Sequence, residues 1–195
     1  TGAEVGVLVA FCSFTFALGI VVLTGIVLLV EPGIADRFVD VLPVEASAVT
    51  GALLLVGVLL YVVGSALKFR PLHIGKVELS YPRLSIALKQ LLIGPLEIIG
   101  AAAIIYFALP SAGNPGFVTI TGIFLISFSL ALLSHAPGGL GVLELAFISG
   151  LPEMDPADVL AALLVFRLLY LIIPFIAALI VVLGFERQQF ANERA

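Results

Sequence analysis

The sequence predicts an all-α fold, a polytopic membrane helix bundle with four full spans and one re-entrant helical hairpin. Of its 195 residues, 62% are hydrophobic and only 11% are charged, more apolar sequence than a soluble domain of this size can bury. The apolar segments are long and do not alternate with polar residues, which indicates helices and not barrel strands. A glycine-rich break between two shorter apolar segments predicts the hairpin.

The four predicted spans each exceed the roughly 20 residues that a helix needs to cross a bilayer. They comprise residues 5–30, 47–67, 84–109 and 159–185. Pro32 and Gly33 end the first span, and Gly94-Pro95 is expected to loosen the helix of the third. Between the first two spans, a short amphipathic turn on the membrane surface is predicted from Ile34, Phe38, Val41 and Leu42.

The distribution of basic residues predicts the orientation of these spans. Residues 68–83 form the only basic-rich connection, with Lys68, Arg70, Lys76 and Arg83, so this loop is expected in the cytoplasm. The connections 31–46, 110–116 and 152–158 then lie outside, and the C-terminus lies in the cytoplasm. This arrangement closes only if residues 117–151 begin and end on the same side of the membrane.

The stretch from Ser134 to Glu144 divides residues 117–151 into two arms. It contains Pro137, Gly138, Gly139 and Gly141, which break a helix and free backbone polar groups. Residue chemistry alone also allows an ordinary turn outside the membrane. The returning arm, residues 142–151, is about 15 Å long as a helix, half a bilayer. Loop charge and arm length together therefore favour a re-entrant hairpin with a Pro-Gly-Gly-Leu-Gly tip.

Three charged residues lie deep in the apolar segments, where an unpartnered charge is costly. They are Glu97, Glu144 and Arg167, whereas Lys89 lies near enough to the cytoplasmic edge to snorkel. The rise per residue gives Glu144 and Arg167 similar depths, so they can pair and staple the hairpin to the last span. Alternatively, the Arg167 guanidinium can hold a lipid phosphate. Arg167 can serve both roles if the lipid phosphate and Glu144 compete for it.

The sequence contains no pattern typical of bond-making chemistry. It has no nucleophile with a base at useful spacing, no metal-ligand cluster and no phosphate-binding loop, so we predict no catalytic residue, no metal and no cofactor. His135 is expected to form a hydrogen bond at a helix end. Cys12 is the single cysteine, so an intrachain disulfide cannot form.

The glycine motif and the last span resemble the lysylphosphatidylglycerol synthase transmembrane family, which includes the multiple peptide resistance factor. The resemblance is carried by the Pro137–Gly141 motif with Glu144 three residues on, followed by Arg167, Tyr170 and Pro174. Upstream it extends to Tyr81-Pro82, Gln90, Glu97, Tyr106 and Leu109-Pro110. It covers residues 65–185 well and residues 5–64 by hydropathy.

The resemblance implies a flippase domain that moves aminoacylated phosphatidylglycerol from the inner to the outer leaflet of the bacterial inner membrane, as in antimicrobial peptide resistance. Residues 1–195 are then one transmembrane domain, the C-terminal portion of a longer flippase-type domain. The site residues for lipid binding or gating are Pro137, Gly138, Gly139, Gly141, Glu144, Arg167, Tyr170 and Glu97.

The expected partners are the membrane and an anionic or aminoacylated phospholipid, with no nucleic acid. A homodimer, further N-terminal spans and a soluble aminoacyltransferase domain are compatible with the resemblance. Whether the whole protein is an enzyme stays open, because the family is often fused to a phosphatidylglycerol lysyltransferase domain. Two alternatives remain: a membrane anchor of a lipid-modifying transferase without translocation of its own, and an accessory structural subunit of a membrane complex.

Overall fold

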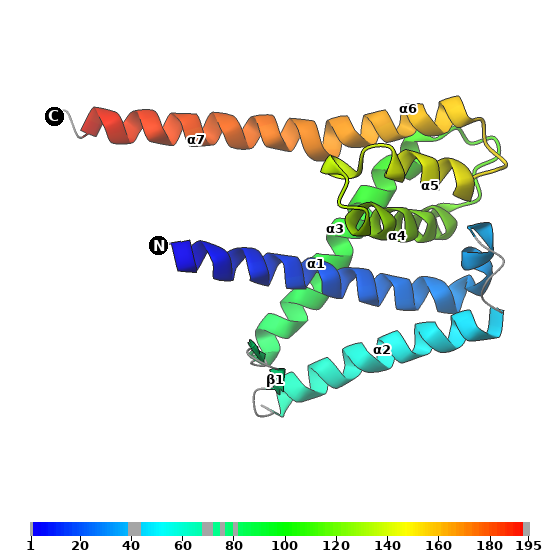
Figure 1. Ribbon diagram of the computed structural model, residues 1–195, viewed down its shortest axis with the longest axis horizontal. Coiled ribbons are helices and arrows are strands. Elements are labelled where there is room, and N and C mark those ends of the chain that lie inside the picture. The colour runs from blue at the N-terminus through cyan, green and yellow to red at the C-terminus, as the bar shows by residue number, and fades with distance from the viewer. Residues whose placement is uncertain (1, 39–43, 68–71, 75–76, 80–81, 193–195) are drawn as a thin grey trace.

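Helices α1 (Gly2–Val30), α2 (Val44–Ala66) and the continuous α6–α7 helix (156–192) run in roughly the same direction in Figure 1, and α3 (Leu84–Ala108) crosses them. This is a computed structural model, and it describes residues 2–38, 44–67, 72–74, 77–79 and 82–192. Both chain ends and the β1 strand lie at one end of the bundle, and the connection after α1 and the turn before α6 lie at the other (Figure 1).

The N-terminal part of the chain is two long helices and their connections. Helix α1 (Gly2–Val30) ends where Pro32 begins the 3-10 helix η1 (Pro32–Arg37), and α2 (Val44–Ala66) follows. Two short strands, β1 (Leu72–Ile74) and β2 (Val77–Leu79), then pair antiparallel, with Leu72 opposite Leu79. This strand pair is a small addition to a fold that is otherwise helical, as predicted.

The C-terminal part contains the crossing helix, the hairpin and the last span. Helix α3 is Leu84–Ala108, α4 is Phe117–Leu133, the 3-10 turn η2 is Pro137–Gly139 and α5 is Val142–Gly150. The last span is continuous and consists of α6 (Pro156–Phe166), the π-helix η3 (Arg167–Ile172) and α7 (Ile173–Asn192). Asp155 begins it by accepting a hydrogen bond from the Ala157 amide, 2.8 Å away.

Within the described residues, four helices are long and apolar enough to cross a membrane. They are Leu8–Val30, Ala46–Ala66, Leu84–Ala108 and Pro156–Phe185. Two shorter apolar helices, Phe117–Leu133 and Pro137–Gly150, form the two arms around the glycine break. Large apolar side chains are exposed along all four long helices, as expected of surfaces that face lipid. The prediction of a polytopic helical membrane bundle is therefore confirmed.

The crossing of α1 and α3 depends on two facing glycines. A Cβ atom at Gly19 would lie 2.5 Å from the Gly94 carbonyl carbon, so the backbones touch with no side chain between them. Although Gly94-Pro95 was expected to loosen this span, α3 continues from Leu84 to Ala108, with Gly94 and Pro95 both buried. The glycine serves close packing here.

The connection after α1 folds onto the bundle. Ile34 is 2% exposed, and a Cβ atom at Gly122 of α4 would lie 2.7 Å from it. The predicted surface turn is therefore wrong for Ile34, because its side chain fits against a glycine of the hairpin. Val41 and Leu42, also assigned to that turn, lie outside the described residues.

Candidate lipid site at the hairpin tip

The backbone of the hairpin tip turns through a series of left-handed residues. His135, Gly138, Gly139 and Gly141 have φ angles of 55°, 62°, 63° and 81°. Only glycine adopts this region without strain, so the glycines allow the chain to reverse within a few residues. All three glycines of the predicted break, Gly138, Gly139 and Gly141, thus have a positive φ. His135 also behaves as predicted, because its Nδ1 lies 2.8 Å from the Leu133 carbonyl oxygen at the helix end.

Gly139 is constrained by space as well as by φ. A Cβ atom at this position would lie 2.8 Å from the Cβ atom of Ala131 in α4. By contrast, nothing lies within 4 Å of a Cβ atom at Gly141. The tip therefore packs tightly against its own first arm at Gly139 and is open at Gly141.

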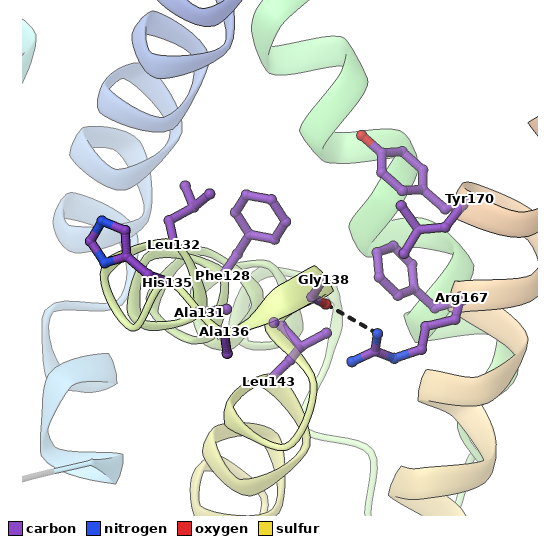
Figure 2. Close-up of a pocket in the computed structure, with 12 residues that line it drawn as sticks. Phe128, Ala131, Leu132, His135, Ala136, Gly138, Leu143, Arg167 and Tyr170 are labelled. Atoms are coloured by element: carbon purple, nitrogen blue, oxygen red, sulfur yellow. Dashed lines mark hydrogen bonds between the residues drawn. The ribbon is translucent and has the colours of Figure 1, made fainter. Parts of the chain in front are cut away.

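The tip is joined to the last span by an ion pair. Arg167 Nε and Nη2 donate to the same oxygen of Glu144, Oε1, at 2.9 and 2.6 Å. Arg167 Nη1 donates to the carbonyl oxygen of Gly138 at 3.1 Å, as Figure 2 shows. The other Glu144 oxygen accepts the Gly141 amide at 2.8 Å, at the start of α5. The predicted pairing of Glu144 with Arg167 is confirmed, and the side chains are only 20% and 13% exposed.

Arg167 is the first residue of the π-helix that interrupts the last span. The Ile173 amide donates to the carbonyl of Leu168, five residues back, which is the wide π pattern. Pro174 follows directly, has no N–H and would crowd the carbonyl of Tyr170 in a regular α-helix. The wide turn relieves this conflict. It lies at the level of the hairpin tip, where it carries both Arg167 and Tyr170.

Tyr170 connects the last span to α3. Its hydroxyl donates to Glu97 Oε1 at 3.0 Å. Its ring stacks on Phe166 with ring centroids 5.2 Å apart and an interplanar angle of 17°. Glu97 is exposed on α3, although it belongs to an apolar span. The structure thus brings Glu97 to the same region as the hairpin tip.

A hollow of about 390 Å³ opens between the hairpin and the last span. Arg167 and Tyr170 lie on its one side and α4 side chains such as Phe128 on the other (Figure 2). Its walls are mostly apolar, with the cationic Arg167 at the edge. The lining residues are Phe128, Ala131, Leu132, His135, Ala136, Gly138, Gly139, Leu143, Phe166, Arg167, Tyr170 and Leu171.

Of the predicted site residues, Gly138, Gly139, Arg167 and Tyr170 line the hollow. Gly141, Glu144 and Glu97 do not line it, but each is tied to the site by the hydrogen bonds described above. Pro137 begins the 3-10 turn η2 and is exposed. Sequence reasoning missed the apolar walls, since residues such as Phe128 and Phe166 look like any other aromatic residue in a span.

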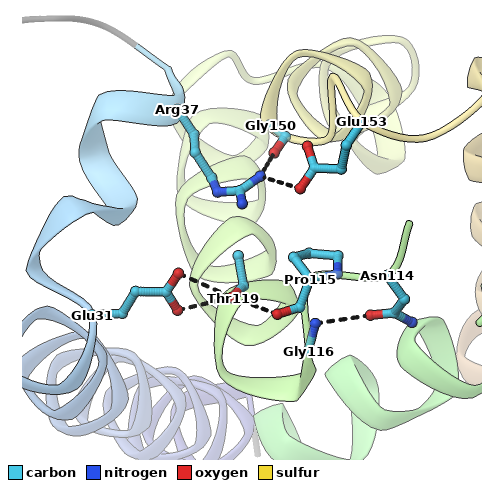
Figure 3. A network of polar contacts seen from close by, with 8 residues as sticks. All are labelled: Glu31, Arg37, Asn114, Pro115, Gly116, Thr119, Gly150 and Glu153. Carbon is cyan, nitrogen blue, oxygen red and sulfur yellow. Dashed lines mark hydrogen bonds and ion pairs between the residues drawn. The ribbon is translucent and has the colours of Figure 1, made fainter. Parts of the chain in front are cut away.

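A second polar cluster holds the base of the hairpin (Figure 3). Arg37 Nη1 of η1 donates to the Gly150 carbonyl at 2.9 Å and to Glu153 Oε1 at 2.8 Å. The Thr119 hydroxyl lies 2.9 and 3.0 Å from the two Glu31 carboxylate oxygens. Partial burial alone would raise the pKa of Glu153. The hydrogen bond and charge of Arg37, with the Glu153 amide, outweigh it and lower the pKa below its ordinary value of 4.5.

A buried hydrogen-bonded chain joins the three N-terminal spans. Gln90 of α3 is 3% exposed, donates to the Thr15 hydroxyl at 3.0 Å and accepts from the Tyr61 hydroxyl at 2.7 Å. A buried amide needs such partners in a membrane interior. In the part of the chain that the structure describes, no group of three His, Cys, Asp or Glu residues is placed to hold a metal ion.

Comparison with known proteins identifies relatives of this chain, although no protein-family model matches it. It is 31% identical over 189 residues to the uncharacterized protein slr0712 of Synechocystis, covering 95% of this chain and 58% of that protein. It is 36% identical over 140 residues to inner membrane protein YbhN of Escherichia coli, covering 71% and 43% of the two chains. The chain thus spans about half the length of these relatives.

A shorter match connects the chain to a lipid-modifying enzyme. Over 92 residues it is 36% identical to the phosphatidylglycerol lysyltransferase of Staphylococcus haemolyticus, covering 46% of this chain and 11% of the enzyme. The lysyltransferase of Bacillus subtilis matches over the same length at 30% identity. The chain is therefore a multi-pass bacterial membrane protein homologous to YbhN and to phosphatidylglycerol lysyltransferases, and its resemblance to the lysylphosphatidylglycerol synthase transmembrane family is confirmed.

Proposed function

We propose that this chain is the C-terminal portion of a flippase-type membrane domain that moves aminoacylated phosphatidylglycerol to the outer leaflet. The observation that carries the proposal is the broken hairpin tip, held by the Glu144–Arg167 ion pair beside a partly apolar hollow. Such breaks at membrane depth are tolerated where they line a cavity, and transporters often bind substrate there. The headgroup is suggested by those relatives that are phosphatidylglycerol lysyltransferases.

The depth of the tip supports a re-entrant hairpin. Arg167 lies eleven residues after Pro156, the first residue of the last span, which is about 16 Å along a helix. This is about half the hydrocarbon thickness of a bilayer. Because Arg167 contacts Gly138 and Glu144, the tip is expected at the same depth, near the middle of the membrane.

Arg167 is suited to the phosphate of the lipid. It uses three of its five N–H donors on Glu144 and Gly138, which leaves two without a partner among the described residues. A guanidinium binds a phosphate with two parallel hydrogen bonds, which an ammonium cannot do. In this proposal the phosphate binds the two remaining donors and weakens the ion pair of Arg167 with Glu144, so lipid entry loosens the tip and the ion pair regains its strength after release.

The experiment is a leaflet-resolved lipid analysis in bacterial cells that make the full-length protein and an aminoacylated phosphatidylglycerol. A membrane-impermeant amine reagent reports the lipid in the outer leaflet. We expect loss of the protein to reduce this signal, and Arg167→Lys to reduce it while the protein still inserts. Arg37→Lys at the hairpin base is the matched control and should be near the parent. If the amount of this lipid in the outer leaflet does not change when the protein is lost, the second candidate function, a membrane anchor for a lysyltransferase, is favoured.

The orientation is tested separately by cysteine labelling in a background with Cys12 replaced. The connection after α1 and the turn before α6 lie at one end of the bundle (Figure 1), and the basic loop, residues 68–83, follows α2 at the other. The basic residues predict that this loop is in the cytoplasm. We therefore expect an impermeant reagent to label position 155 and not position 76, which lies outside the described residues. Labelling of position 76 alone would contradict a cytoplasmic C-terminus.

A further inference from the structure

Among the described residues, no cation forms an ion pair with the Glu97 carboxylate. It lies in the apolar helix α3, and its described hydrogen bond comes from the neutral hydroxyl of Tyr170. Among the described residues, the ion pairs are Arg37 with Glu153 and Arg167 with Glu144, and neither reaches Glu97. Lys89 of the same helix is eight residues away, about 12 Å along the axis. A charge at this depth is expected to have a partner.

The surroundings of Glu97 suit an ammonium group. Tyr170 bridges the carboxylate and the hollow, because its hydroxyl is bound to Glu97 while its side chain lines the cavity. The ring of Tyr170 stacks on Phe166, which lines the same hollow. An aromatic face beside a carboxylate attracts cations by both charge and cation–π contact.

Tyr170 links the cationic and the anionic residue of the site, because it lines the hollow with Arg167 and its hydroxyl donates to Glu97. Arg167 and Tyr170 are three residues apart in the π-helix η3, and both line the hollow. A ligand whose anionic group lies at Arg167 can therefore extend along the Tyr170 side chain toward Glu97. Glu144 cannot take the second role in the same way, because its two oxygens accept from Arg167 and from the Gly141 amide.

We infer that Glu97, positioned by Tyr170, receives the ammonium group of a phospholipid headgroup whose phosphate lies at Arg167. The inference rests on the proposed function and deepens it. It makes Glu97 the residue that distinguishes an ammonium-bearing lipid from plain phosphatidylglycerol. Arg167 serves both lipids alike, since both carry a phosphate. Arg167 thereby provides affinity for the phosphate of either lipid, and Glu97 provides specificity for the ammonium group.

The test is lipid binding by the purified full-length protein in nanodiscs, with phosphatidylglycerol and lysyl-phosphatidylglycerol as probes. We expect the parent protein to prefer the lysyl lipid by about tenfold, equal to about 1.4 kcal/mol. Glu97→Gln still accepts the Tyr170 hydrogen bond but has no charge. It should bring the preference close to one by weakening the binding of the lysyl lipid. Glu153→Gln, the same change at the hairpin base, should keep the preference.

A change in the lipid tests the same point without a variant. Acetylation of the lysyl amines removes the ammonium groups, and the parent protein should then bind this lipid no better than phosphatidylglycerol. Equal binding of the two unmodified lipids by the parent, or a full preference in Glu97→Gln, would overturn the role of Glu97 and leave the lipid site intact. If the parent retains neither lipid and Arg167→Lys changes nothing, the proposed lipid site itself is wrong.

Discussion

The tip and the base of the hairpin use the same contacts in different surroundings. At the tip, Arg167 binds the Gly138 carbonyl and Glu144. At the base, Arg37 binds the Gly150 carbonyl and Glu153. The tip pair is 13% and 20% exposed and belongs to apolar segments, whereas the base pair is 25% and 34% exposed and lies outside the spans.

This difference decides what each pair contributes. An exposed ion pair stabilises a protein by about 0–1 kcal/mol because water screens both charges. When one partner of a buried pair is removed, the other is left without compensation, at a cost of about 3 kcal/mol or more. The Arg37–Glu153 pair at the base is therefore expected to add little stability, whereas the Glu144–Arg167 pair is expected to stabilise the non-helical backbone of the tip.

The largest expected difference between the two ends concerns their glycines. Gly139→Val places a β-branched residue at a φ of 63° and against the Ala131 Cβ atom, so we expect a loss of about 3 kcal/mol or more. A Cβ atom at Gly150 would lie 2.8 Å from Phe38 Cζ and 3.1 Å from Ile123 Cγ2, but Gly150 has no positive φ, so the loss in Gly150→Val should be smaller. Thermal unfolding in detergent measures both. Equal losses would mean that the tip is no more tightly constrained than the base.

The next effect is the coupling between Arg167 and Glu144. We expect Arg167→Ala to destabilise the protein by about 3 kcal/mol, because it leaves Glu144 unpaired in an apolar segment. Glu144→Gln in that background should recover part of the loss, since the amide oxygen still accepts the Gly141 N–H. A double-mutant cycle on thermal stability measures the coupling. Additive losses would show that the two side chains do not stabilise each other.

The matching cycle at the base should give a small value. We expect Arg37→Ala to cost about 1 kcal/mol, including the lost hydrogen bond to the Gly150 carbonyl, and its coupling to Glu153→Gln to shrink at high salt. The same detergent unfolding assay at two salt concentrations measures this. If the coupling energy of Arg37 with Glu153 equalled that of Arg167 with Glu144 and did not change with salt, the exposed fractions of the side chains would not explain the difference between tip and base.

The smallest effect is the pH dependence of the base pair. Because the pKa of Glu153 is lowered in the folded protein, its stabilisation is present above about pH 4.5 and is lost as the pH falls through the folded-state pKa. Between pH 6 and pH 3, the parent should therefore lose slightly more stability than Glu153→Gln. An identical pH profile for the two proteins would show that Arg37 does not hold the carboxylate.

Sequence reasoning could find the spans, the broken hairpin and the Glu144–Arg167 pair, because each depends on local chemistry. The length of an apolar segment predicts a span, glycines predict a break in a helix, and the rise per residue predicts how deep a side chain lies in the membrane. It could not find that Gly19 faces Gly94 or that Ile34 folds against Gly122, because these contacts depend on how distant helices cross. Sequence reasoning missed the polar cluster at the hairpin base for the same reason. Arg37 looked like a loop charge, and its partner Glu153 is 116 residues away.

The π-helix has a consequence for the rotational phase of the last span. An α-helix turns about 100° per residue, so a wide turn shifts everything after it relative to everything before. Helix α6 directs Val159, Ala162, Leu163 and Phe166 into the core, whereas residues 171–185 are exposed on every side of the helix. The π-helix thus separates a half of the last span that packs against the core from a half that is exposed. Deletion of a single residue within 167–172 would restore regular α-helical winding, so residues of this segment such as Arg167 and Tyr170 would change their direction relative to the hairpin tip.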